Sequence, residues 1–74
     1  MMTEKQLKEF YKSTLESATF WQKGIVTCAK DNNMNGVLNC KQNLDRIYIK
    51  ANLIRHILHP FKNDPEFVKV FGND

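Results

Sequence analysis

The chain contains few of the residues from which small functional sites are usually built. Its 74 residues include only two cysteines, two prolines and three glycines, which excludes a disulfide-rich scaffold and a glycine-rich phosphate-binding loop. No serine nucleophile elbow, metalloprotease pattern or Asn-x-Ser/Thr sequon occurs. Repeats and low-complexity tracts are also absent, so a folded protein is expected. We therefore expect a protein that is not an enzyme and that uses no metal or other cofactor.

Long apolar runs are missing as well. The N-terminal segment begins Met-Met-Thr-Glu-Lys and stays amphipathic, so neither a signal peptide nor a membrane-spanning segment is predicted. The simplest location is then the cytoplasm of a bacterium or of a host cell, with no membrane partner. Nine lysines against two arginines, together with eight asparagines, point by association to an AT-rich gene of phage or mobile-element type.

Two helices joined by a short loop account for most of the sequence. Thr3 and Gln6 fit a capping box, and the apolar residues that follow recur at helical spacing up to about residue 30: Leu7, Tyr11, Leu15, Ala18, Trp21 and Ile25. The asparagines and the glycine in residues 31–36 favour a turn, and Pro60 ends the next helix. We predict helices over about residues 4–30 and 36–59, with a loop over about 31–35.

The C-terminal part of the sequence carries the signal for the start of a third helix. Asp64-Pro65-Glu66 supplies an N-cap residue, a proline at the first helical position and an acid in the first turn, which predicts a short helix over about residues 65–71. The expected fold is all-α: an antiparallel two-helix hairpin with a short C-terminal helix, residues 1–74 forming one domain. A chain this short buries only about 60% of its unfolded surface, so we also expect the protein to oligomerise.

The second long helix is apolar on two sides, whereas a surface helix needs only one apolar stripe. The first helix is expected to cover one stripe: Val37, Cys40, Leu44, Ile47, Tyr48, Ala51, Ile54 and Leu58. The opposite stripe is Leu38, Ile49, Leu53 and Ile57, and the short tail helix is expected to cover it only near Ile57. We therefore predict an interface with another chain, built from Ile49, Leu53, Ile57, Phe20, Phe67 and Phe71.

Polar residues between the two stripes form a second candidate site: Lys41, Asp45, Asn52, Arg55, His56 and His59. They are either an ordinary solvated edge or a contact site for an anion or a protein partner. Arg55 lies close to the first stripe, so its cation needs a carboxylate, a carbonyl or a ligand, or must extend into solvent. His56 and His59 have no further ligands nearby in the sequence, so no metal site is expected.

The two cysteines lie symmetrically about the loop, on the same side of the expected hairpin. In a reducing compartment Cys28 and Cys40 are expected to be buried thiols that behave as small hydrophobes. A disulfide between them stays open as an alternative if their Cα atoms come within reach.

The function class that these features favour is a small helical interaction protein, which binds and regulates or inhibits a protein partner, either itself or another chain. One alternative is a binder of small anionic, nucleotide-like ligands, with Arg55, Lys41 and Tyr48 or Tyr11 in pockets between protomers. A nucleic-acid partner is possible but not favoured, because the net charge is only +3 and the cations spread around the helix: Lys41, Arg46, Lys50, Arg55 and Lys62.

Overall fold

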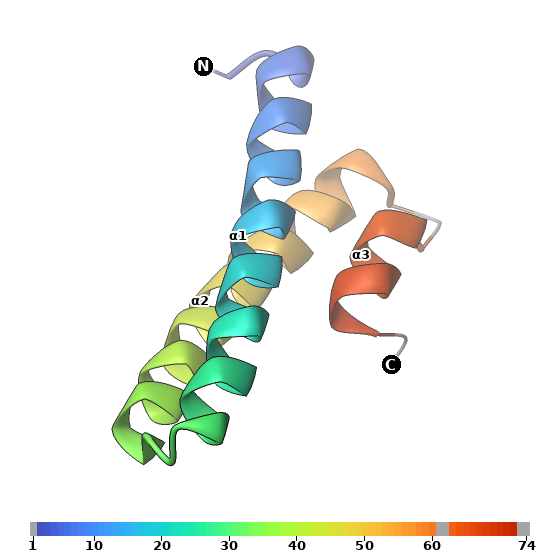
Figure 1. Cartoon of the computed structure of the whole chain (residues 1–74). Coiled ribbons are helices and arrows are strands. Elements are labelled where there is room, and N and C mark those ends of the chain that lie inside the picture. The colour runs from blue at the N-terminus through green and yellow to red at the C-terminus, as the bar shows by residue number, and fades with distance from the viewer. Residues whose placement is uncertain (1, 61–62, 73–74) are drawn as a thin grey trace.

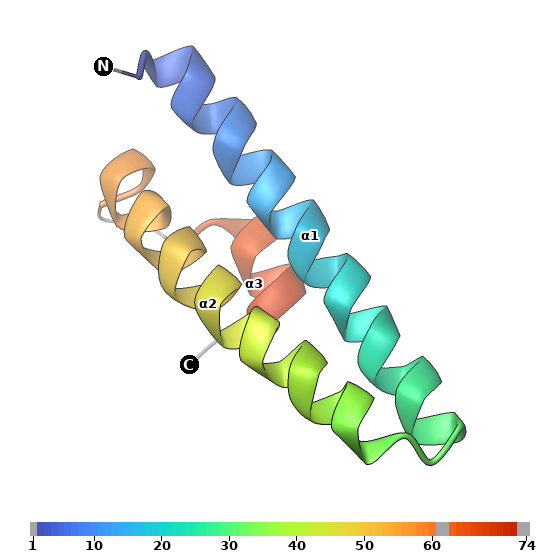
Figure 2. The ribbon, with the colours of Figure 1, turned by 90° about the vertical axis from the view of Figure 1, so that its left-hand side faces the viewer.

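The computed structural model describes residues 2–60 and 63–72, and these residues form three α-helices and no strand. Helix α1 spans Glu4–Lys30, α2 spans Met34–Leu58 and α3 spans Pro65–Phe71. Helices α1 and α2 run antiparallel and side by side, and α3 lies on one face of this pair (Figures 1 and 2). The structure thus confirms the predicted helical hairpin with a short C-terminal helix.

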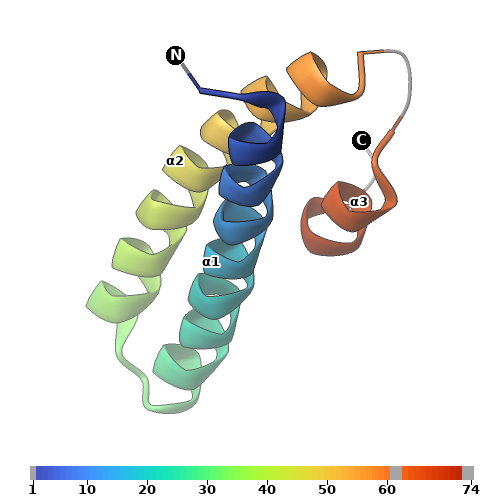
Figure 3. The ribbon, with the colours of Figure 1, turned by 90° about the horizontal axis from the view of Figure 1, so that it is seen from above.

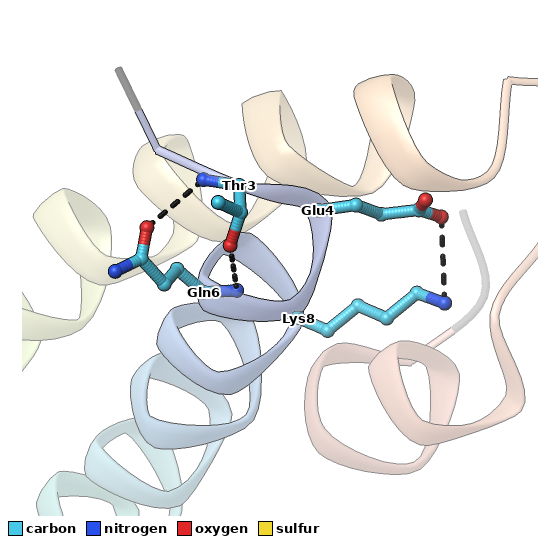
Figure 4. A network of polar contacts seen from close by, with 4 residues as sticks. All are labelled: Thr3, Glu4, Gln6 and Lys8. Atoms are coloured by element: carbon cyan, nitrogen blue, oxygen red, sulfur yellow. Dashed lines mark hydrogen bonds and ion pairs between the residues drawn. The ribbon is translucent and has the colours of Figure 1, made fainter.

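The capping box predicted at the start of α1 is confirmed. The Thr3 hydroxyl accepts a hydrogen bond from the Gln6 backbone N–H at 3.1 Å, and the Gln6 side-chain oxygen accepts one from the Thr3 N–H at 2.9 Å (Figure 4). Two of the N–H groups that a helix start leaves without partners are satisfied in this way. The neighbouring ion pair of Lys8 with Glu4, 3.4 Å apart, is exposed and adds little to stability.

The connection between the long helices is shorter than the sequence suggests. Asn32 adopts a left-handed backbone with a φ of 56°, and the Asn33 side chain accepts a hydrogen bond from the Gly36 N–H at 3.0 Å. Asn33 is therefore the N-cap, and α2 begins at Met34 rather than near residue 36. At the other end α2 stops at Leu58, and His59 is its C-cap residue. Several asparagines in a row can each cap a helix, so the pattern alone did not select Asn33.

The core of the molecule is small because the molecule is thin. Its Cα atoms extend over 42 × 26 × 14 Å, and no large side chain in the described part of the chain is completely shielded from solvent. Two alanines with no exposed surface, Ala18 and Ala51, mark close approaches inside the hairpin. The central cluster takes residues from all three helices: Tyr11, Leu15, Ala51, Ile54 and Phe67.

Helix α3 joins the core at a different place from the one expected. Phe67 and Phe71 pack on Tyr48, with ring centroids 5.9 and 5.2 Å away, and Tyr48 belongs to the first apolar stripe. Gln22 of α1 also donates a hydrogen bond to the Val70 carbonyl at 2.7 Å. The prediction that the tail helix covers the second stripe near Ile57 is therefore wrong. The aromatic rings of α3 pack instead on Tyr48 of the first apolar stripe, and the view from above shows α3 lying beside the hairpin (Figure 3).

Candidate functional site

The side of α2 that α3 leaves open carries the most exposed apolar residues of this helix apart from Met34. Their exposed fractions are 57% for Leu38, 69% for Ile49, 63% for Leu53 and 60% for Ile57. We call these four residues the outer face of α2. Figure 2 views the hairpin from the side opposite α3, where both long helices are uncovered. Single exposed apolar residues are common on protein surfaces, but an aligned set on one helix marks a surface that another molecule can cover.

Charged residues border the outer face. Lys50 lies toward α1, because its Nζ is 5.6 Å from the centroid of the Phe10 ring. Arg46 is one turn before Lys50 on the same side of the helix, and both side chains are exposed. Asp45, also exposed, is the only acidic residue of α2. The border of the outer face therefore carries more positive than negative charge.

The other residues predicted for the interface separate into two groups. Phe20 is 68% exposed, and its ring meets the neighbouring Trp21 edge-on, with the centroids 5.5 Å apart. Phe67, in contrast, is only 6% exposed and Phe71 is half-buried, since both pack inside the chain. Phe67 therefore serves the fold and offers almost no surface to another chain, whereas part of Phe71 is still exposed. The sequence pattern did not reveal this because it does not show which stripe α3 meets.

The polar residues of α2 do not form one continuous site. Arg55 is the centre of one group: its Nη2 donates to the Asn52 side-chain oxygen at 2.7 Å and lies 3.4 Å from the His56 ring nitrogen. His59 belongs to a different place, where its ring centroid is 6.4 Å from that of Tyr11. Lys41 and Asp45 are exposed and lie several turns away from Arg55 along α2.

The positive charge of Arg55 is stabilised by an aromatic ring and an amide oxygen rather than by a carboxylate. Its guanidinium lies over the Phe67 ring, 4.7 Å from the centroid, and Nη1 donates to the Asn63 side-chain oxygen at 3.4 Å. Among the described residues no carboxylate lies within ion-pair distance of it, and its buried Nε has no hydrogen-bond partner. A small pocket of about 40 Å³ adjoins this cation and is lined by Tyr48, Arg55, Asn63, Phe67, Val68, Phe71 and Gly72.

A larger groove, which the sequence did not indicate, lies between α1, α3 and the end of α2. Its volume is about 740 Å³, and its lining includes Tyr11, Leu15, Leu58, Asp64, Lys69 and Val70. The Tyr11 hydroxyl is buried there without a hydrogen-bond partner in the described chain. Burial, and then the nearby Asp64 carboxylate, raise the pKa of Tyr11 well above its ordinary value. The phenol of the folded protein therefore keeps its proton to a higher pH than a free tyrosine does. Acidic and basic residues both line the groove.

The described side chains contain no group of three potential metal ligands. Within the same residues, no helix has the length and apolar character needed to span a membrane. Two residues lie outside the described part of the chain: Phe61, and Lys62, which is one of the candidate nucleic-acid contacts.

Comparison with protein-family models, with curated proteins and with solved structures found no match for this chain. The assignment of a function therefore rests on the residues themselves.

Proposed function

We propose that this chain is a non-enzymatic interaction protein, which binds a protein partner through the outer face of α2 and regulates the partner by occupying its binding surface. The single observation that carries this proposal is the exposure of Ile49, Leu53 and Ile57 along one side of α2, between 60% and 69% of each residue. Burying one such side chain completely stabilises a complex by roughly 1.5–3 kcal/mol. Covering three of them therefore contributes several kcal/mol before the costs of association.

The charges around the outer face indicate what kind of partner fits. Arg46 and Lys50 lie on the border near α1, and Asp45 is the one acid that α2 offers. A partner helix with apolar residues at spacings of three and four and with acidic residues beside them matches both features. A second copy of the chain matches the apolar spacing, because Ile49 and Ile57 are equidistant from Leu53, but it supplies no row of acids. We therefore propose another protein as the occupant, with self-association as the competing outcome.

Two matched substitutions test the proposal. Leu53→Glu places a charge in the centre of the outer face, whereas Val26→Glu places the same charge at a residue of α1 that is similarly exposed, at 55%. We expect the tagged wild type and Val26→Glu to purify from producing cells with the same partner in fixed stoichiometry, and Leu53→Glu to purify alone. Retention of the partner by Leu53→Glu, or purification of all three as free monomers, would contradict the proposal.

A specific observation supports a second candidate function, the binding of a small anion. Arg55 is a half-buried cation that has no carboxylate partner in the described chain, and it sits beside the aromatic rings of Tyr48, Phe67 and Phe71. Inorganic phosphate and adenosine monophosphate are suitable probes. If this candidate is correct, either probe raises the melting temperature of the wild type and of Arg46→Lys but not of Arg55→Gln. Equal shifts in all three proteins would rule it out.

Nucleic-acid binding stays the least favoured prediction. Two of its candidate cations turn toward different parts of the molecule, since Lys50 lies over Phe10 of α1 and Arg55 lies over Phe67 of α3. Phosphate recognition along a duplex favours cations gathered on one surface. The described cations of α2 do not provide such a surface.

A further inference from the structure

The closed end of the hairpin brings two thiols and two glycines together. Cys28 and Gly24 are one turn apart on α1, and Gly36 and Cys40 are one turn apart on α2. A Cβ atom added at Gly24 would lie 3.1 Å from the Cys40 sulfur, and one added at Gly36 would lie 2.7 Å from the Cys28 sulfur. Each sulfur therefore occupies the space that the glycine of the opposite helix leaves free.

This reciprocal arrangement holds both sulfurs in the narrow space between the helices. Cys28 is also tied to the start of α2, because its carbonyl accepts a hydrogen bond from the Asn33 N–H at 2.8 Å. Both cysteines are free thiols in the structure. Disulfide formation requires Cα atoms within about 7 Å and Cβ vectors that converge. The glycine opposite each cysteine removes the side chain that would hold the two helices further apart at this point.

We propose that Cys28 and Cys40 form a reversible intramolecular disulfide, which staples the closed end of the hairpin when a low-molecular-weight disulfide such as oxidised glutathione is present. The disulfide does not depend on the proposed partner, because the three residues that carry the proposed function, Ile49, Leu53 and Ile57, lie at least two turns of α2 beyond Cys40. Of the outer face, Leu38 alone lies within one turn of Cys40.

The two thiols differ in their exposure to solvent, and this difference sets the order in which they react with the small disulfide. Cys28 is half-buried, whereas Cys40 is only 5% exposed. Burial, followed by the neighbouring Cys28, raises the pKa of the Cys40 thiol. The more accessible Cys28 thiolate therefore attacks one sulfur of the small disulfide first, which forms a mixed disulfide and releases one small thiolate.

The second step forms the disulfide between Cys28 and Cys40. Cys40 loses its proton to solvent and attacks the Cys28 sulfur, and the bond from Cys28 to the small thiol breaks with release of a second thiolate. In total, two protein thiols lose two electrons and two protons, and one small disulfide is reduced to two thiols. An excess of the reduced small thiol reverses both steps, so in a strongly reducing compartment the pair stays open.

Peptide mapping tests the proposal on the wild-type chain. Lysines at positions 23, 30 and 41 let trypsin place Cys28 in the peptide of residues 24–30 and Cys40 in that of residues 31–41. After treatment with oxidised glutathione, we expect the intact protein to lose two hydrogens in mass and these two peptides to stay joined until reduction. A stable glutathione adduct on Cys28, a disulfide between two chains, or two unmodified thiols would each overturn the proposal.

A second measurement compares the melting temperatures of the oxidised and reduced wild type. The oxidised monomer should melt roughly 10 °C or more above the reduced one, because the staple restricts the unfolded chain. Cys28→Ala, the control, should show no change in melting temperature on the same treatment. An oxidised wild type that melts at or below the temperature of the reduced protein would contradict a staple that fits the native structure.

Discussion

The guanidinium of Arg55 in α2 lies over the ring of Phe67 in α3, with the guanidinium carbon 4.7 Å from the ring centroid. Phe67 is buried and Arg55 is half-buried, so the contact lies at the point where the short helix joins the hairpin. The same guanidinium donates hydrogen bonds to the side-chain oxygens of Asn52 and Asn63. This one side chain therefore helps to fix α3 on the first apolar stripe of α2, and it leaves the outer face uncovered.

Arg55→Lys is predicted to weaken this junction although the charge is kept. An ammonium group can neither stack on Phe67 nor donate in the same planar fork, so we expect a loss of about 1–2 kcal/mol in the free energy of unfolding. Urea denaturation followed by circular dichroism measures it. Arg46→Lys, at an exposed residue of the same helix, is the matched control and should change stability by less than about 0.5 kcal/mol. Equal effects at both positions would show that Arg55 contributes only its charge.

The buried hydroxyl of Tyr11 predicts a change in stability at alkaline pH. Its pKa is raised in the folded protein, so the unfolded chain releases this proton at a lower pH than the folded one. The contribution of Tyr11 to the free energy of unfolding is constant below the ordinary tyrosine pKa of about 10. Stability is lost as the pH rises above that value.

Tyr11→Phe isolates this effect. At pH 7 the variant should be as stable as the wild type or slightly more stable, because it removes a buried hydroxyl that has no partner in the described chain. Between pH 9 and pH 11 the wild type should lose stability more steeply than Tyr11→Phe, which lacks this hydroxyl. Parallel curves over this range would contradict the placement of Tyr11.

Gly36 is predicted to tolerate a methyl group poorly. A Cβ atom there would lie 2.7 Å from both the Cys28 sulfur and the Asn33 side-chain nitrogen, so overpacking should outweigh the gain of about 1 kcal/mol in helix propensity. We expect Gly36→Ala to be destabilised by about 1–2 kcal/mol, and Gly24→Ala, where the closest atom is 3.1 Å away, by less.

A double variant provides the check on Gly36. Because Cys28→Ala removes one of the two close atoms, Gly36→Ala should cost less in that background than in the wild type. Thermal unfolding of the four proteins gives the coupling energy. Additive effects would mean that the Cys28 sulfur does not occupy the space beside Gly36.

The parts of the fold that depend on local chemistry could be predicted from the sequence. The side chains of Thr3, Gln6 and Asp64 each mark a helix start through hydrogen bonds within two or three residues, and such bonds depend on little else. The boundary at Asn33 does not follow from such local bonds alone, because the nearby Asn35 can cap a helix equally well.

The parts of the fold that depend on packing between helices could not be predicted from the sequence. The stripe pattern of α2 showed two apolar sides, but the choice of α3 between them depends on Phe67, Phe71 and Tyr48 packing together across distant parts of the chain. For the same reason the groove beside Tyr11 has no signature in the sequence. The exposure of Leu53, in contrast, follows from the two-sided pattern once one side is covered.

The most direct test of the central claim, that another protein docks on the outer face of α2, is photo-crosslinking from position 53 in producing cells. A benzophenone amino acid in place of Leu53 should give one covalent adduct with a second protein, identified by mass spectrometry, and the same amino acid in place of Val26 should give none. An adduct with a second copy of the 8.7 kDa chain, no adduct, or equal adducts from both positions would contradict the account.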